Sequence, residues 1–132
     1  MVYFSDLRAK IEGFNNLGRG WDSYGGVPPS PSLVARALSI LDACHQVNLQ
    51  PTGVCPGPSG DIAFYFQARG CDVELSVKED TLEVFVATEP LRMEDSQEWA
   101  FPDTPENRVV ALKLVMESLA TGRPSTWTSP SA

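Results

Sequence analysis

Few side chains in this 132-residue chain have the types and spacing that metal binding requires. His45 is the only histidine. Cys44 precedes it directly, and neighbouring residues of a helix do not face each other, so the two cannot bind one ion together. The ligand spacings of zinc and calcium sites are missing from the sequence. We therefore expect no metal site and an ordinary helical position for His45.

Motifs for nucleophilic catalysis or phosphate binding are missing too. The segment GRGWDS lacks the third glycine of a dinucleotide-binding loop, and GPSG lacks the lysine of a P-loop. A serine or cysteine nucleophile could take its base from His45 alone. The cysteines form no CxxC pair, and we interpret them as reduced packing residues: Cys44, Cys55 and Cys71. The sequence predicts no catalytic residue and no cofactor.

The segment GWDSYGG, residues 20–26, is the most distinctive local feature. Asp22 can accept hydrogen bonds from nearby backbone N–H groups, as in an Asx-turn. Trp21 and Tyr24 can close the edge of the domain with their rings. We favour this structural role, and the alternative is a ligand or protein hot spot built on the same two aromatic residues.

Helical periodicity and capping residues place three helices. The first runs from Ser5, as its cap, to about Leu17, and the second from Pro31 to about Val47 behind a Ser30 cap. Thr104 and Pro105 begin the third, which ends near Gly122. We expect the third helix to bury one apolar stripe, made of Val109, Leu112, Val115, Met116 and Leu119.

Apolar residues alternate with polar ones in three segments, 62–66, 73–77 and 82–86, which predicts three strands. Tight turns at Arg69-Gly70 and Glu79-Asp80 pair residues whose numbers sum to 139 and 159. This register puts the alternating apolar side chains of the three segments on one face: Ile62, Phe64, Phe66, Val73, Leu75, Val77, Leu82, Val84 and Val86. A less favoured turn sequence at 79–80 leaves a longer turn possible there.

Two further segments can extend this sheet. Residues 97–101 can form a fourth strand after the acidic loop Glu89–Asp95, and Val54–Cys55 can form a short extended piece. The fold class is α+β: an antiparallel β-meander of three to four strands with two to three helices packed on its apolar face. We expect a single domain over residues 1–122, followed by a loose tail at 123–132.

The opposite face of this sheet carries the most plausible binding residues. The register sets Tyr65, Glu74 and Phe85 side by side, with Glu83 nearby. If a helix covers this face, the two aromatic residues belong to the core. If the face is bare, they form a protein-binding patch. Carboxylates that point into solvent do not form a general acid–base pair, so we expect no enzyme.

The net charge of −7 is concentrated in the middle of the chain. Residues 61–106 carry twelve acidic and three basic side chains, whereas residues 1–60 are neutral and residues 107–132 carry a net +2. A basic footprint for nucleic acid is missing, so we expect no direct nucleic-acid binding. The acidity favours solubility or a basic protein partner. Without a signal peptide or a bilayer-spanning apolar run, the sequence predicts a cytoplasmic protein without membrane contact.

The segment from Leu17 to Val86 resembles a small uncharacterised bacterial and phage family. That family has a GWDxYGAxPP loop, a helix, and then strands written P…DGGxxLEW and ELEIEV. The residues at matching positions are Trp21, Asp22, Tyr24, Gly25, Pro28 and Pro29. Gly26 replaces the usual Ala, Ser59-Gly60-Asp61 replaces Asp-Gly-Gly, and Phe64-Tyr65-Phe66 replaces Leu-Glu-Trp. Such genes often form half of a two-gene pair, so the resemblance implies an antitoxin or immunity role without catalytic residues or a cofactor.

These observations together predict a non-enzymatic acidic module that neutralises a basic or nucleic-acid-binding protein. It would act as an antitoxin or immunity-type protein, or as a phage-encoded inhibitor of a bacterial defence complex such as CRISPR. Its expected protein-binding residues are Tyr65, Glu74, Glu83, Phe85, Trp21 and Tyr24. The alternatives are a small-molecule or enzymatic role centred on Trp21–Gly26, and a homo-oligomeric subunit joined edge to edge through Thr81–Ala87. The oligomeric state stays open.

Overall fold

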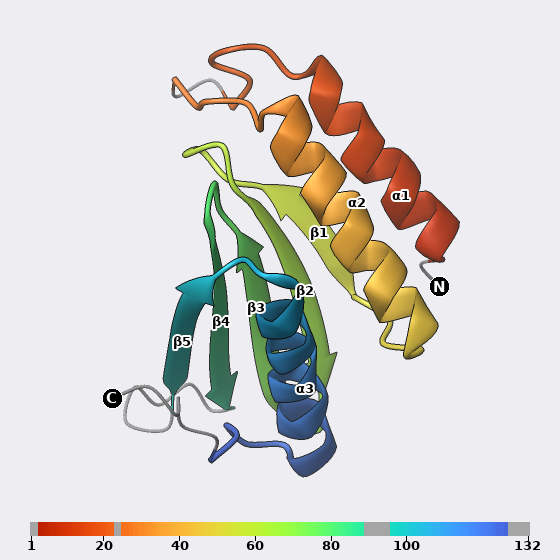
Figure 1. Ribbon diagram of the computed structural model, residues 1–132, viewed down its shortest axis with the longest axis vertical. Coiled ribbons are helices and arrows are strands. Elements are labelled where there is room, and N and C mark those ends of the chain that lie inside the picture. Colours follow the sequence, from red (N-terminus) through yellow and green to blue (C-terminus); the bar gives the residue numbers. More distant parts are fainter. Residues whose placement is uncertain (1–2, 23–24, 89–95, 127–132) are drawn as a thin grey trace.

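The computed structural model describes residues 3–22, 25–88 and 96–126. The chain is an α+β fold in which three helices and a short 3-10 turn accompany one antiparallel sheet (Figure 1). The strands lie in the sheet in the order in which they occur along the chain. The elements are α1 (Phe4–Gly13), η1 (Phe14–Asn16), α2 (Pro31–Gln46), β1 (Gly53–Pro56), β2 (Ile62–Ala68), β3 (Cys71–Val77), β4 (Thr81–Thr88), β5 (Gln97–Pro102) and α3 (Pro105–Thr121).

The helices all lie on one side of the sheet, which we call the inner face (Figure 1). Helix α2 contacts β2 and β3, helix α3 contacts β2, β3 and β4, and α1 packs mainly on α2. The inner-face side chains of the three central strands are fully buried: Ile62, Phe64, Phe66, Val73, Leu75, Val77, Leu82, Val84 and Val86. Burial of these apolar residues is the main driving force for the packing of the helices on the sheet.

The strand register confirms the prediction from alternation. Phe64 pairs with Leu75, which pairs with Val84 on the next strand, as the sums of 139 and 159 require. Arg69 and Gly70 both have positive φ angles, 54° and 73°, as a two-residue hairpin turn needs. At the other turn, 79–80, the Lys78 N–H donates to the Thr81 carbonyl over 2.9 Å, so this turn is also tight.

The sheet has five strands rather than three or four. The extended piece at Val54–Cys55 is part of β1, which pairs with β2, and the segment 97–101 lies within β5, which pairs with β4. A strand of four residues that ends in proline is tolerated here because β1 lies at an edge of the sheet. Strand β4 is paired on both sides, so edge-to-edge association through residues 81–87 is ruled out.

Two of the three predicted helix starts are confirmed. The Ser30 hydroxyl accepts from Leu33 N–H over 3.2 Å, and the Thr104 hydroxyl accepts from Asn107 N–H over 3.1 Å. Helix α1 begins at Phe4 with Tyr3 at its N-cap, so the prediction of Ser5 as its cap is wrong.

The apolar stripe of α3 is displaced from the predicted one. Val109 is 53% exposed, whereas Ala111, Leu114 and Ser118 are buried beside the predicted Leu112 and Val115. The predicted stripe and the buried stripe have Leu112 and Val115 in common. Packing selects the stripe that also contains the small side chains of Ala111 and Ser118. Small residues let the helix axis approach the sheet closely. Among the described residues, no helix has the length and apolarity needed to cross a bilayer.

A buried carboxylate joins three parts of the fold. Asp103 follows β5, and its side chain is only 3% exposed. Its oxygens accept from Arg36 Nε on α2 over 2.7 Å, and from Arg108 on α3 over 2.6 Å from Nε and 3.1 Å from Nη2. The Arg36 guanidinium also donates to the Glu79 carbonyl, and the Asp103 N–H donates to the Asp80 carbonyl over 2.9 Å. Asp103 therefore connects α2 and α3 through its side chain and the β3–β4 turn through its backbone N–H.

Substitution of Asp103 should destabilise the fold and change its acid sensitivity. Burial alone would raise the pKa of Asp103, but hydrogen bonds from Arg108 and Arg36 lower it below the ordinary 3.8. Because the folded pKa is the lower one, this stabilisation is complete above about pH 4 and is lost as the pH falls through the folded pKa. We expect Asp103→Asn to lower the free energy of unfolding at pH 7 by about 2 kcal/mol, since it leaves two arginines without their carboxylate.

Urea unfolding of the parent chain and of the Asp103→Asn variant between pH 7 and pH 2 measures this effect. The difference in unfolding free energy between the two proteins should shrink towards acid pH as the carboxylate takes up its proton. A difference that is constant over the whole pH range would show that the charge of Asp103 is unimportant for stability.

Candidate functional site

We call the face of the sheet that points away from the helices the outer face. The sequence left open whether a helix covers this face. No described helix lies on it (Figure 1). The register places Tyr65, Glu74, Phe85 and Glu98 in one row across β2, β3, β4 and β5. Tyr65 is 40% exposed, and Glu74 and Phe85 are half-buried. The predicted aromatic pair therefore lies on a surface that the described helices leave open.

The carboxylates of the outer face differ in their partners. The pKa of Tyr65 is raised, first by burial and then by the charge of the neighbouring Glu74. Glu83 pairs with Lys78 through Oε1 and Nζ at 3.1 Å, and this carboxylate raises the pKa of Lys78. Of the two predicted binding carboxylates, Glu83 thus has a basic partner, whereas Glu74 pairs with no lysine or arginine among the described residues.

A hollow of about 500 Å³ opens in the outer face next to this row. It forms where the small side chain of Ala87 follows Phe85 on β4 and lies opposite Asp72 on β3. The Gln67 side-chain amide donates to Asp72 Oδ1 over 2.6 Å at its margin. The lining combines aromatic rings with carboxylates: Thr52, Tyr65, Phe66, Gln67, Asp72, Val73, Glu74, Phe85 and Ala87.

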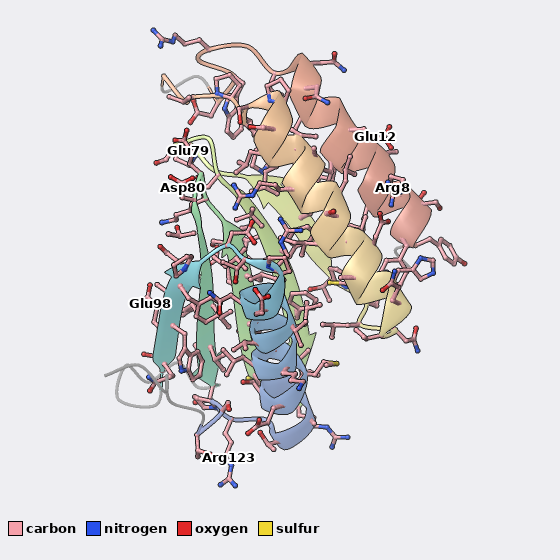
Figure 2. All side chains as sticks on the ribbon, viewed as in Figure 1. Arg8, Glu12, Glu79, Asp80, Glu98 and Arg123 are labelled. Atoms are coloured by element: carbon pink, nitrogen blue, oxygen red, sulfur yellow. The ribbon has the colours of Figure 1, made fainter. Side chains whose placement is uncertain are left out.

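Three residues of this surface were missed by the sequence analysis: Gln67, Asp72 and Glu98. The signal for Gln67 and Asp72 was present, because their numbers sum to 139 like those of every other pair between β2 and β3. Glu98 could not be placed opposite Phe85 from sequence, since the segment between Thr88 and Gln97 contains no short turn motif that would set the register. Figure 2 shows Glu98 on β5, with Glu79 and Asp80 at the β3–β4 turn. The acidic side chains thus come from several strands.

The GWDSYGG loop is held together by its own hydrogen bonds. Asp22 Oδ1 accepts from Gly26 N–H over 2.8 Å, and Gly20 N–H donates to the Gly26 carbonyl over 2.8 Å. The Trp21 indole N–H donates to the Val27 carbonyl over 3.2 Å. These bonds support the structural role for Trp21 and Asp22. Tyr24 lies outside the described residues.

This loop and the outer face form separate surfaces. The loop docks on the β1–β2 connection, where Val27 N–H donates to the Pro58 carbonyl over 2.8 Å. A second hollow of about 360 Å³ lies beside it, at the start of α2. Several of its polar groups already bind each other or a neighbour: the Ser30 and Ser32 hydroxyls lie 3.1 Å apart, and Arg36 binds Asp103. Trp21 does not line this hollow, and the loop's bonds hold the loop rather than a ligand.

The residues considered for metal binding and nucleophilic chemistry do not form a common metal site among the described residues. The His45 ring stacks on Phe4 with centroids 4.3 Å apart. Within the described ranges, no group of three histidine, cysteine or acidic side chains could hold a metal ion. Cys44 and Cys71 are buried, and burial raises the pKa of Cys71 and raises that of Cys44 to about 12, whereas Cys55 is exposed.

The three thiols should therefore react at very different rates. A thiol reacts as its thiolate, so the two buried cysteines should stay unmodified in the folded protein. With a chromogenic disulfide reagent at pH 8, we expect one thiol per chain to react quickly and all three to react in urea. Cys55→Ser should abolish the fast reaction. Fast reaction of Cys44 or Cys71 in the folded protein would show that an accessible thiolate exists and would reopen the question of a nucleophile.

Comparisons of the chain with protein-family models, curated proteins and solved structures gave no match. The resemblance carried by the GWDSYGG segment therefore stays a prediction. The arguments for function rest on the surface described above, above all on the aromatic and acidic row of the outer face.

Proposed function

We propose that this chain is a non-enzymatic acidic module whose outer face binds and neutralises a basic, nucleic-acid-binding protein. The observation that carries this proposal is the composition of the open sheet face. Tyr65 and Phe85 supply aromatic contact area there, and Glu74 and Glu98 supply negative charge without forming an ion pair to any described lysine or arginine. The chain itself offers no basic footprint for nucleic acid.

Charge and contact area have separate tasks in this proposal. Carboxylates on a rigid sheet can occupy positions that nucleic-acid phosphates take in the partner's groove, and they speed association by electrostatic attraction. Aromatic side chains are enriched among the residues that dominate binding energy, because they bury much area with little loss of conformational entropy. Tyr65 and Phe85 lie beside Glu74 in the same row. The row therefore combines both contributions.

Two biological forms fit this chemistry. One is an antitoxin or immunity-type protein that blocks a toxic nuclease, and the resemblance of residues 17–86 supports it. The other is a phage-encoded inhibitor of a bacterial defence complex, such as a CRISPR complex. Both place the protein in the cytoplasm with its target. The module needs neither a cofactor nor a metal ion in either form.

Charge reversal of the outer face should weaken binding without unfolding the protein. We expect Glu74→Lys with Glu98→Lys to weaken partner binding at least about tenfold, or ~1.4 kcal/mol, since two attractive contacts become repulsive. The free energy of unfolding should change by less than about 0.5 kcal/mol, because both side chains lie on the outer face, outside the core, and neither forms an ion pair with a described residue. The tagged full-length chain is used to capture partners from nuclease-treated host lysate at two salt concentrations, and calorimetry then measures the affinity for the partner found.

A matched control separates local charge from net charge. Glu12→Lys with Glu117→Lys makes the same change in net charge on exposed positions of α1 and α3 (Glu12 is labelled in Figure 2). Both positions lie near helix C-termini, where a lysine is tolerated well. This control should retain the partner. Equal losses in both variants, or a partner retained by both, would contradict the proposal, as would a captured partner whose binding is insensitive to salt.

A further inference from the structure

We infer that the hollow in the outer face is a seat for an arginine side chain of the partner protein. This inference rests on the proposed function and specifies its central contact. The hollow combines the two groups that a guanidinium binds best, aromatic rings and carboxylates, on neighbouring strands.

The strand register places these groups around one position. Tyr65 and Phe85 flank Glu74 directly, each as its cross-strand neighbour. Side chains paired in this way lie about 5 Å apart at their Cβ atoms, so a group above Glu74 has an aromatic ring on either side. The hollow continues from this row towards Asp72 and Ala87.

The carboxylates of the hollow, Glu74 and Asp72, also favour binding of a cationic group from a partner protein. Several carboxylates elsewhere in the described chain have basic partners: Asp42 pairs with Arg8, Glu83 with Lys78, and Asp103 with Arg36 and Arg108. In contrast, neither Glu74 nor Asp72 forms an ion pair within the described ranges. Asp72 uses Oδ1 to accept from Gln67, which leaves its second oxygen for another donor.

Arginine fits these groups better than lysine does. Its guanidinium is planar, so it can stack on the Phe85 or Tyr65 ring while its N–H groups bind a carboxylate in parallel. A lysine ammonium is more strongly hydrated and cannot stack in this way. A volume of about 500 Å³ accommodates the guanidinium and part of its aliphatic stem. The sheet supplies a rigid base on which this geometry is preformed.

Short peptides test this seat independently of any partner protein. The full-length chain is titrated with acetyl-Gly-Arg-Gly-amide and with the same peptide carrying lysine or citrulline, and binding is followed by NMR. We expect the arginine peptide to shift the amide signals of residues 65, 74 and 85. The lysine peptide should bind about fivefold more weakly, because it has charge without stacking. The citrulline peptide, which is planar but neutral, should not bind.

Two substitutions separate the contribution of the carboxylate charge from that of aromatic stacking. Glu74→Gln should abolish arginine binding, and Phe85→Leu should remove the preference for arginine over lysine. Glu12→Gln on α1 is the control that should change neither. Tyr65→Leu is a second test of stacking if Phe85→Leu alters the fold, which the same spectra report. Equal binding of the arginine and lysine peptides, or arginine binding that survives Glu74→Gln, would overturn the inference.

The seat and the proposed function can fail separately. If a basic partner is captured and lost on charge reversal, but the arginine peptide does not bind, the seat is wrong and the neutralising function stands. If the arginine peptide binds as expected but no basic partner is captured at either salt concentration, the seat stands and the proposed function is wrong.

Discussion

The pairing of β2, β3 and β4 through two-residue turns is the constraint on which the rest of the structure depends. Side chains alternate between the faces of a sheet, so each register fixes the side of every residue at once. A shift by one residue would place Glu74 and Glu83 against the helices and expose Phe64 and Leu75. The apolar inner face and the acidic outer face are therefore two results of the same register. The candidate binding surface exists because the core is correctly paired.

Asp103 supplies a connection that apolar packing alone does not. Helices α2 and α3 cover different parts of the inner face, and a shared carboxylate binds one arginine from each. Contacts of Arg36 and Asp103 with the backbone of residues 79 and 80 add the β3–β4 turn to this cluster. Since that turn sets the register of β4, the cluster links the placement of the helices to the pairing of the strands.

The sequence predicted the features that depend on local patterns. Alternation and short turns were enough for the three central strands, and side-chain caps were enough for the starts of α2 and α3. The cluster around Asp103 could not be predicted, because Arg36 is 67 residues away along the chain. The aromatic row was found in sequence, but its exposure was not, since coverage of a face depends on where distant helices pack. The pairing of Glu83 was missed although Lys78 lies just across a tight turn from it.

The outer face has an aromatic and acidic composition that solvent exposure alone does not require. Threonine, lysine or glutamine would suit solvent-exposed positions of a strand, and a mixture of both charge signs favours solubility. Here two aromatic residues stand beside carboxylates, and the basic residue Lys78 is paired with Glu83 rather than with Glu74. Neither Tyr65 nor Phe85 is needed for the core, which is formed on the opposite face. The core therefore does not account for the composition of this row, and the proposed contact with a basic protein would account for both its rings and its charge.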